Sequence, residues 1–160
     1  MTNEKCALDT LVPDFSIIAT NDTDGKLSSY SEKNILLFFY PKDSTPICTS
    51  EAKAFRDYFE AFTDRNTVIF GVSRDNLTSH ERFKEKLQLP FELISDSSEQ
   101  LCNYFDVIAI KNFFGKKIHG IVRSTFLIDK QRLLRAAWRK IKVTGHIEEV
   151  LEEIDALKNR

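Results

Sequence analysis

The chain has 160 residues, 42% of them apolar, and a formal net charge of −1. This length fits one domain, residues 1–160, whose apolar residues can fill a core without disulfide bonds. The balanced charge excludes a protein that binds nucleic acid through overall basicity, and the absence of a long apolar run excludes a membrane-spanning helix.

The first part of the chain predicts a β-hairpin followed by a central strand. A polar turn sequence, residues 21–25, separates the short β-like runs Asp14–Thr20 and Lys26–Tyr30, as in a hairpin. Asn34–Tyr40 is a continuous apolar run that ends at Pro41. Runs of this kind are typical of a strand buried on both faces of a sheet.

Helical and strand patterns alternate in the middle of the chain. From residue 48 to about residue 64, apolar residues recur at spacings of three and four, which is one stripe of an α-helix. Thr67–Val72 is a second apolar run and predicts a buried strand. Leu77–Leu89 has a helical pattern, and its first turn carries a capping box from Thr78 to Glu81.

The alternation continues to the C-terminus. Phe91–Ser95 predicts a short strand, and Ser97 with Gln100 forms a second capping-box pattern, which opens a short helix ending at about Phe105. The last predicted elements are a strand over Ile121–Ile128, its antiparallel partner over Leu133–Trp138 and a helix with an apolar stripe from Ile147 to Leu157. This order predicts a three-layer α/β fold with a mixed central sheet and an N-terminal β-hairpin.

Three cysteines, Cys6, Cys48 and Cys102, are widely separated in the sequence. A disulfide framework in a secreted protein would be denser and even in number. The N-terminal segment 1–10 lacks the long apolar stretch of a secretory signal. We therefore expect a cytoplasmic protein whose thiols are reduced.

Cys48 is the first candidate for chemistry, because it follows a buried strand and a loop and opens a predicted helix. The helix dipole and the free backbone N–H groups of a first helical turn favour a thiolate, which is the reactive nucleophile. The same residue heads the apolar stripe, so the alternative is an inert buried cysteine between helix and sheet.

Three further residues could serve a reactive Cys48. Thr45 lies three residues earlier, and its hydroxyl could reach the sulfur or a substrate oxygen; the alternative is a turn or cap residue. Pro41 stiffens the loop and could shield the thiol, or it simply ends the strand. Arg123 opens an apolar strand, where its cation could keep a thiolate ionised or else face solvent.

The stretch 39–52 resembles the peroxidatic loop of the peroxiredoxins. The motif Pro-x-x-x-Thr-x-x-Cys is met by Pro41, Thr45 and Cys48, and Arg123 matches the arginine that completes the family's site. Within the family the chain is most similar to the peroxiredoxin Q, or bacterioferritin comigratory protein, group. The resemblance covers nearly the whole chain and implies a thioredoxin-like fold.

The resemblance implies a thiol-dependent peroxidase that reduces hydrogen peroxide and small organic hydroperoxides without a haem, flavin or metal cofactor. The Cys48 thiolate would attack the peroxide O–O bond and become a sulfenic acid, while Thr45 and Arg123 align the peroxide. Pro41 would shape the pocket, and Glu51 matches an acid of the family that orients the site. Thioredoxin or another thiol would restore the enzyme, which by the same resemblance is a monomer.

The cysteines that resolve the sulfenic acid in many members of this group are missing here. Their two usual positions hold Lys53 and Lys84. We therefore expect a one-Cys mechanism, in which an external thiol reduces the sulfenic acid directly. Cys102 is a candidate resolving residue, although core packing also explains it, and Cys6 lies on an N-terminal arm that could reach another subunit.

The segment 111–142 holds ten Lys and Arg residues but only one acid, a local balance of +9. We interpret this segment as a solvated face. One alternative is a surface for single-stranded nucleic acid, because Phe113, Phe114 and Trp138 lie among the cations. Another is a docking surface for an acidic reductant such as thioredoxin, in which case reduction should slow as salt rises.

Two other functions compete with the peroxidase. A thiol–disulfide oxidoreductase on the same fold is disfavoured because the chain has no Cys-x-x-Cys motif, whose second thiol releases mixed disulfides. The other is a non-enzymatic binding or chaperone module. The sequence shows no metal-site spacing, since His80, His119 and His146 are far apart, and we expect the last two to be surface or capping residues.

Overall fold

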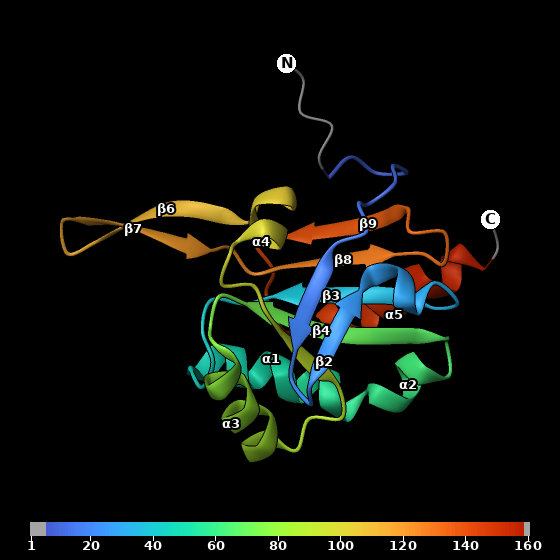
Figure 1. The fold of residues 1–160 in the computed structure, drawn as a ribbon, viewed down its shortest axis with the longest axis horizontal. Coiled ribbons are helices and arrows are strands. Elements are labelled where there is room, and N and C mark those ends of the chain that lie inside the picture. The colour runs from blue at the N-terminus through green and yellow to red at the C-terminus, as the bar shows by residue number, and fades with distance from the viewer. Residues whose placement is uncertain (1–5, 159–160) are drawn as a thin grey trace.

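The computed structural model describes residues 6–158, and a seven-stranded sheet forms the centre of the molecule (Figure 1). In spatial order its strands are β2 (Thr23–Lys26), β1 (Ser16–Ala19), β5 (Glu92–Ser95), β4 (Thr67–Ser73), β3 (Asn34–Phe39), β8 (Ser124–Ile128) and β9 (Leu134–Arg139). Strands β3, β4 and β5 run parallel, and the other pairs are antiparallel. This arrangement confirms the predicted mixed sheet with an N-terminal hairpin.

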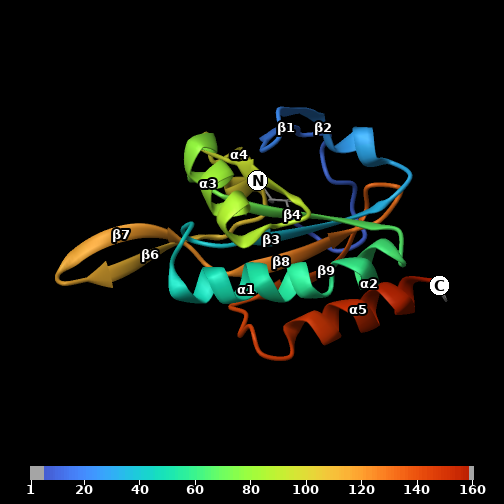
Figure 2. The same cartoon turned by 90° about the horizontal axis from the view of Figure 1, so that it is seen from below.

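Helices lie on both faces of this sheet. They are α1 (Pro46–Asp57), α2 (Phe59–Thr63), α3 (Leu77–Leu87), α4 (Gln100–Tyr104) and α5 (His146–Leu157). Figure 2 shows α1, α2 and α5 together on one side of the sheet and α4 on the other. The buried side chains form two clusters, one beneath α1, α3 and α5 and the other beneath α4 and the N-terminal hairpin. No helix within residues 6–158 is both long and apolar enough to span a bilayer.

The apolar run of β3 contributes to both clusters, because successive side chains of a strand point to opposite faces. Leu36 and Phe38 pack in the cluster beneath α1, whereas Leu37 and Phe39 pack in the cluster beneath α4. This alternation confirms the prediction of a strand buried on both faces. The loop after β3 therefore starts at the carboxyl edge of the parallel strands, where α/β proteins commonly place their sites.

The N-terminal hairpin is shorter than the sequence predicts. The expected strand over Lys26–Tyr30 is wrong, because β2 ends at Lys26 and a 3-10 helix, η1 (Leu27–Tyr30), follows it. The chain bends here because the Asp14 carboxylate accepts hydrogen bonds from the Ser28 N–H and hydroxyl, at 2.8 and 2.7 Å. A contact between separate segments thus overrides the local strand pattern.

The caps of two helices also differ from the prediction. The N-cap of α3 is Asn76, whose side chain accepts a hydrogen bond from the Ser79 N–H at 2.8 Å, so the capping box expected from Thr78 is wrong. Helix α4 follows Glu99, which has a φ of 65° and makes no side-chain cap, so the capping box expected from Ser97 is also wrong. Both sequence patterns occur within a residue or two of a true helix start without capping it.

A second hairpin, which the sequence patterns did not predict, projects from the body of the molecule (Figures 1 and 2). It consists of β6 (Ile108–Phe113) and β7 (Lys116–Ile121), which form a separate two-stranded sheet. Most side chains of β7 are exposed on both faces, so no one-sided apolar pattern marks it as a strand. The strand expected over Ile121–Ile128 is confirmed as β8 from Ser124 onward, whereas Ile121 belongs to β7.

Candidate active site

Cys48 lies in the first turn of α1, beyond the carboxyl end of β3. The helix begins two residues earlier than predicted, at Pro46, because proline suits the first helical position and Thr45 takes the extended conformation of an N-cap. The Cys48 side chain is 1% exposed, in the cluster beneath α1. Because the N–H groups of a first turn lack partners within the helix, the start of α1 favours a negative charge on the sulfur.

Arg123 brings a cation to Cys48 from a position 75 residues away in the sequence. It lies in the loop between β7 and β8, outside the strand expected for it. Its Nη2 donates to the Cys48 Sγ at 3.3 Å, and its Nη1 lies 2.6 Å from the Glu51 Oε1. The Arg123 side chain is only 12% exposed, so water screens these interactions weakly.

Glu51 lies one helical turn after Cys48 and is buried beside Arg123. Burial raises the pKa of Glu51 to about 7, and the adjacent Arg123 cation acts in the opposite direction. The Glu51 Oε2 is a buried atom with no hydrogen-bond partner within residues 6–158. A carboxyl group in this environment can bind or release a proton near neutral pH.

Thr45 and Pro41 belong to the loop that joins β3 to α1. The Thr45 hydroxyl donates to the Lys42 carbonyl oxygen at 2.9 Å. Because a hydroxyl has one hydrogen and two lone pairs, Thr45 can still accept a hydrogen bond from a bound substrate. Pro41 is half-buried directly after Tyr40, which is fully buried, so the loop starts from a fixed point in the core.

The other two thiols do not lie beside Cys48. Cys102 and Cys48 belong to the two different apolar clusters, with the central sheet between them. Burial and the neighbouring Asp96 raise the pKa of the Cys102 thiol well above its usual range, and the Cys102 N–H donates to the Asp96 Oδ2 at 2.8 Å. Cys6 packs against the Cys102 cluster and donates to the Tyr104 carbonyl. Within residues 6–158, no disulfide bond joins any two of the three cysteines.

Two of the three histidines are buried, whereas His119 is exposed as expected. His146 is buried rather than at the surface, its Nε2 lies 2.8 Å from the Thr125 hydroxyl, and burial lowers its pKa to about 4.

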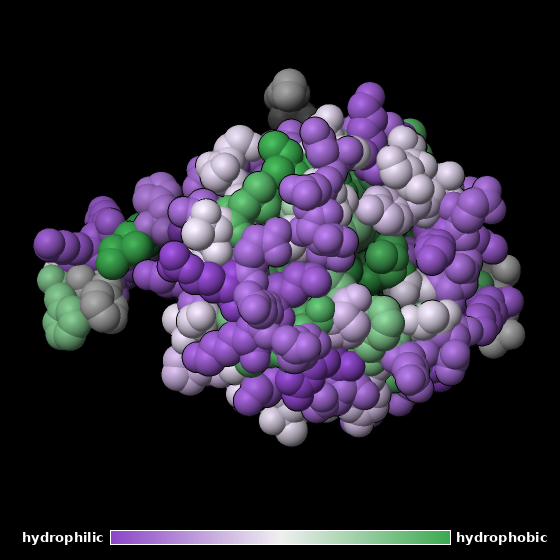
Figure 3. All heavy atoms as spheres, turned by 60° about the horizontal axis from the view of Figure 1, so that its bottom comes forward, coloured by the Kyte–Doolittle hydropathy of each residue, from purple (hydrophilic) through white to green (hydrophobic). Residues whose placement is uncertain are grey.

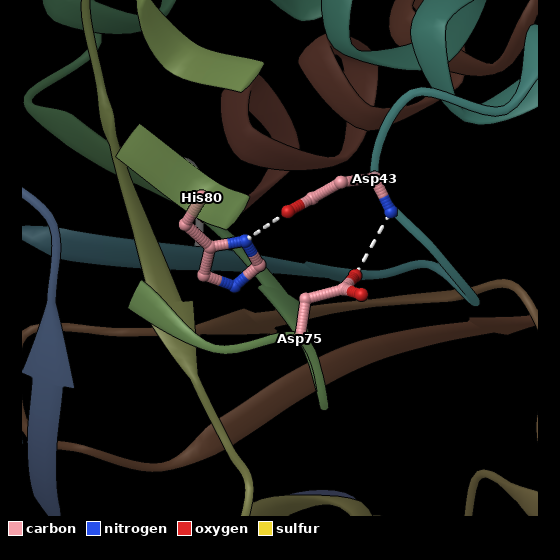
Figure 4. Close-up of side chains that lie close together, drawn as sticks. All are labelled: Asp43, Asp75 and His80. Carbon is pink, nitrogen blue, oxygen red and sulfur yellow. Dashed lines mark hydrogen bonds and ion pairs between the residues drawn. The ribbon is translucent and has the colours of Figure 1, made fainter. Parts of the chain in front are cut away.

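His80 is also buried and forms a cluster with Asp43 and Asp75 (Figure 4). Asp43 and His80 are 37 positions apart in the sequence, so local spacing does not predict this cluster.

The residues around Cys48 favour one kind of chemistry. The Cys48 sulfur lies in the first turn of α1, next to the Arg123 guanidinium. A positive charge beside the sulfur stabilises the thiolate and any oxygen that leaves with a negative charge. Such a site suits a reaction in which the sulfur attacks one atom and an oxygen atom leaves with the bonding electrons.

Comparison with known proteins places the chain among sulfur-dependent redox proteins. Residues 8–137 match the model of the AhpC/TSA family. The chain is 46% identical to Peroxiredoxin Bcp of Bacillus subtilis (strain 168) over 148 residues, which are 92% of this chain and 94% of that protein. It is 40% identical to Peroxiredoxin Bcp of Xanthomonas campestris pv. campestris over 156 residues, which are 98% of each chain.

Solved structures have the same fold. Peroxiredoxin Q of Xanthomonas campestris is 41% identical and superimposes with a TM-score of 0.84, over 89% of this chain and 90% of that one. A structure of the Xanthomonas campestris bacterioferritin comigratory protein, solved to study its alkyl peroxide reduction activity, is 40% identical with the same TM-score of 0.84 and the same coverage. These matches confirm the thioredoxin-like fold expected from the sequence.

Proposed function

Since the chain belongs to the AhpC/TSA family and, within it, to the peroxiredoxin Q group of thiol-dependent peroxidases, we propose that Cys48 is the residue that reduces the peroxide. A peroxide is the substrate and a thiol supplies the electrons. The observation that carries the proposal is the contact of the Arg123 Nη2 with the Cys48 Sγ at 3.3 Å, at the N-terminus of α1. Thr45, Pro41 and Glu51 complete the proposed site.

The reaction starts when the Cys48 thiolate attacks one oxygen of the peroxide. The O–O bond breaks, a sulfenic acid forms on the sulfur, and the second oxygen leaves with the bonding electrons and takes up a proton. The product is water from hydrogen peroxide or an alcohol from an organic hydroperoxide. Arg123 stabilises both the thiolate and the departing oxygen, because its planar guanidinium holds several donors at once.

Thr45, Glu51 and Pro41 orient this reaction. Thr45 accepts a hydrogen bond from the peroxide and aligns the O–O bond with the sulfur, which lowers the entropic cost of the attack. The ion pair of Glu51 with Arg123, at 2.6 Å, holds the guanidinium in the orientation in which it contacts Cys48. Pro41 shapes the wall of the pocket at the start of the loop.

An external thiol restores the enzyme in a one-Cys cycle. The sulfenic acid and a thiol form a mixed disulfide and water, and a second thiol then releases reduced Cys48 and a disulfide. The burial of Cys102 in the other apolar cluster supports this cycle. A disulfide needs Cα atoms within about 7 Å, so Cys102 could resolve Cys48 only after local unfolding of α1 or α4.

The remaining parts of the proposal concern the reductant, the oligomeric state and the compartment in which the protein works. We assign a protein dithiol of the thioredoxin type as the reductant, because it carries both of the thiols that the cycle consumes. We also propose a single-domain monomer that works in the cytoplasm. Thiols stay reduced in that compartment, as the one-Cys cycle requires of Cys48.

Intact-mass spectrometry tests this proposal. Reduced protein is treated with one equivalent of hydrogen peroxide, quenched within seconds and measured without reductant. We expect a gain of about 16 Da, the mass of one sulfenic oxygen. Cys48→Ser should abolish the gain, and the matched variant Cys102→Ala should retain it. A loss of about 2 Da in the parent would instead show an internal disulfide and overturn the one-Cys cycle.

A further inference from the structure

Asp43, Asp75 and His80 form a buried polar cluster beside the loop that leads to α1 (Figure 4). Asp43 lies in that loop, Asp75 lies in the loop before α3, and His80 lies in the first turn of α3. Asp43 is 5% exposed and His80 is not exposed at all. Groups that can carry a charge at this depth require partners, because an unpaired buried charge is strongly unfavourable.

The Asp43 carboxylate has three hydrogen-bonding partners. The Tyr40 hydroxyl donates to Oδ1 at 2.6 Å, and the Ser79 hydroxyl donates to Oδ2 at 2.7 Å. The His80 Nδ1 lies 2.7 Å from the same Oδ2. Three partners around one carboxyl group satisfy it in the core and fix its position. Burial and the neighbouring Asp43 carboxyl group raise the pKa of Tyr40, so its hydroxyl remains a donor.

His80 has an acceptor at each ring nitrogen. Its Nε2 lies 2.9 Å from the Ile94 carbonyl oxygen, and because a carbonyl can only accept, Nε2 carries a hydrogen. Its Nδ1 lies 2.7 Å from the Asp43 Oδ2, so one hydrogen lies between these two atoms. Both ring nitrogens of His80 therefore have a hydrogen-bond partner, and the ring is held from two sides.

A bound metal ion would be the alternative explanation of this cluster, since the three side chains offer ligand atoms within 4.8 Å of one another. Hydrogen bonds already occupy those atoms. The Asp75 Oδ2 accepts from the Asp43 N–H at 2.8 Å and from the Ser73 hydroxyl at 2.7 Å. The facing atoms of Asp43 and His80 are bridged by one hydrogen, which accounts for their contact without a metal.

The hydrogen bond between His80 and Asp43 holds the loop that carries the proposed peroxide-binding residues. Asp43 is fixed twice, through its side chain by His80 and through its N–H by Asp75. The next residue, Ser44, has a φ of 64°, a left-handed conformation that non-glycine residues keep only where their surroundings impose it. Thr45 follows directly and forms the N-cap of α1.

We propose that His80 is a positioning residue for peroxide reduction, acting through Asp43 on the Thr45 hydroxyl and on the first turn of α1. The inference rests on the proposed roles of Cys48 and Thr45. His80 touches none of the reacting atoms in this scheme. It maintains the loop geometry in which the peroxide meets the sulfur, and a displacement of about 1 Å in such a site can slow a reaction about a hundredfold.

The test compares His80→Asn with His146→Asn, because His146 is a second buried histidine that lies outside the Asp43 cluster. Both variants are measured at a temperature where circular dichroism shows that they are folded. Single-turnover oxidation of Cys48 by hydrogen peroxide should slow at least about tenfold in His80→Asn. It should stay close to the parent rate in His146→Asn. An unchanged rate in folded His80→Asn, or an equal fall in both variants, would overturn the positioning role.

A second measurement does not depend on activity. Long-range proton–nitrogen NMR of histidine-labelled protein should show a hydrogen on the His80 Nε2, which faces the Ile94 carbonyl. The His80 Nδ1 signal should shift in Asp43→Asn, because the partner of this nitrogen changes. An Nδ1 signal that is the same in parent and Asp43→Asn, or a stoichiometric metal ion in the purified protein, would contradict the contact. Because this signal needs no turnover, it separates a failure of this inference from a failure of the role proposed for Cys48.

Discussion

At the scale of single residues, the site depends on one guanidinium with two partners. Arg123 faces the Cys48 sulfur with one terminal nitrogen and the Glu51 carboxylate with the other. A lysine cannot reproduce both contacts, because its ammonium group is a single point of charge on a flexible stem. All three side chains are largely buried, so each contact contributes more than it would in water.

The first prediction follows from this geometry. Arg123→Lys should slow the oxidation of Cys48 by hydrogen peroxide about a hundredfold, because the cation no longer stabilises the thiolate and the departing oxygen together. Stopped-flow measurement of one turnover gives the rate. The control is Arg65→Lys, which weakens an ion pair of 2.9 Å with Asp155 away from the site. Equal rates in the two variants would show that Arg123 plays no part in the chemistry.

Glu51 provides a prediction about pH and stability. Its pKa is about 7 in the folded protein against an ordinary value of 4.5, so the folded state binds more protons than the unfolded state between these pH values. Stability therefore falls as pH rises through this window, by at most about 3 kcal/mol. Glu51→Gln removes this dependence, and urea unfolding of both proteins from pH 5 to pH 8 measures the difference.

Parent and variant must be compared because the contribution of His146 to stability changes with pH in the opposite direction. Burial lowers its pKa from 6.5 to about 4, so His146 costs stability as pH falls through that range. The two effects overlap and partly cancel in the parent. His146 is present in both proteins, so only Glu51 contributes to the difference between their curves. Parallel curves for parent and Glu51→Gln would mean that Glu51 is ionised throughout.

At the scale of elements, the central sheet separates two buried thiols, because Cys48 and Cys102 belong to different apolar clusters. Strand β3 sends alternate side chains into the Cys48 cluster and the Cys102 cluster. Phe38 of β3 stacks on Phe55 of α1, with ring centroids 4.5 Å apart, so the strand supports the helix that carries the thiol. The packing between β3 and β4 is close enough to require a glycine at residue 71. A Cβ atom at Gly71 would lie 2.7 Å from the Leu93 Cδ2 and 2.9 Å from the Phe38 Cζ.

Gly71→Ala should therefore destabilise the protein by about 1–3 kcal/mol, because an added methyl group overpacks a filled core. The matched control is Gly120→Ala in β7, where an added Cβ would meet only the flexible Lys111 side chain at 3.5 Å. Urea unfolding measures both variants against the parent. A Gly71→Ala variant as stable as Gly120→Ala would show that the core rearranges without cost.

At the scale of the whole molecule, the β6–β7 hairpin carries positive charge, and a short loop joins it to Arg123 and β8. The β6–β7 hairpin extends from the body as an arm with mixed apolar and hydrophilic side chains (Figure 3). Its exposed lysines are Lys111, Lys116 and Lys117, and β7 ends two residues before Arg123. An acidic reductant that approaches Cys48 would meet this arm, and opposite charges accelerate such encounters.

This arrangement predicts that reduction of oxidised Cys48 by an acidic thioredoxin slows as salt rises. Reversing the hairpin charges with Lys111→Glu, Lys116→Glu and Lys117→Glu should lower that rate roughly tenfold at low salt. Reduction by uncharged dithiothreitol should not change. The matched control reverses three exposed lysines elsewhere, Lys33, Lys130 and Lys158, for the same change in net charge. A salt-independent rate, or equal losses in both triple variants, would remove the steering role of the hairpin.

The periodic elements were predictable because apolar spacing is a local property of the chain. Local spacing was enough to predict the buried run of β3, the helical stripes of α1, α3 and α5, and the motif of Pro41, Thr45 and Cys48. The sequence also led to the family and to Arg123, because residues that share a reaction keep recognisable types and order. The sequence patterns did not predict the β6–β7 hairpin, because the first four residues of β7 are exposed in succession and show no one-sided apolar pattern.

Which distant residues lie together depends on the tertiary structure. Arg123 reaches Cys48 across 75 residues, and His80 reaches Asp43 across 37. The sheet order brings the loops after β3 and β4 and the loop before β8 to one edge of the sheet, because β8 runs antiparallel to β3. No local pattern encodes that order. The same order places Cys102 behind the sheet, away from Cys48. Spacing along the chain determines the elements, whereas strand pairing determines which side chains share a site.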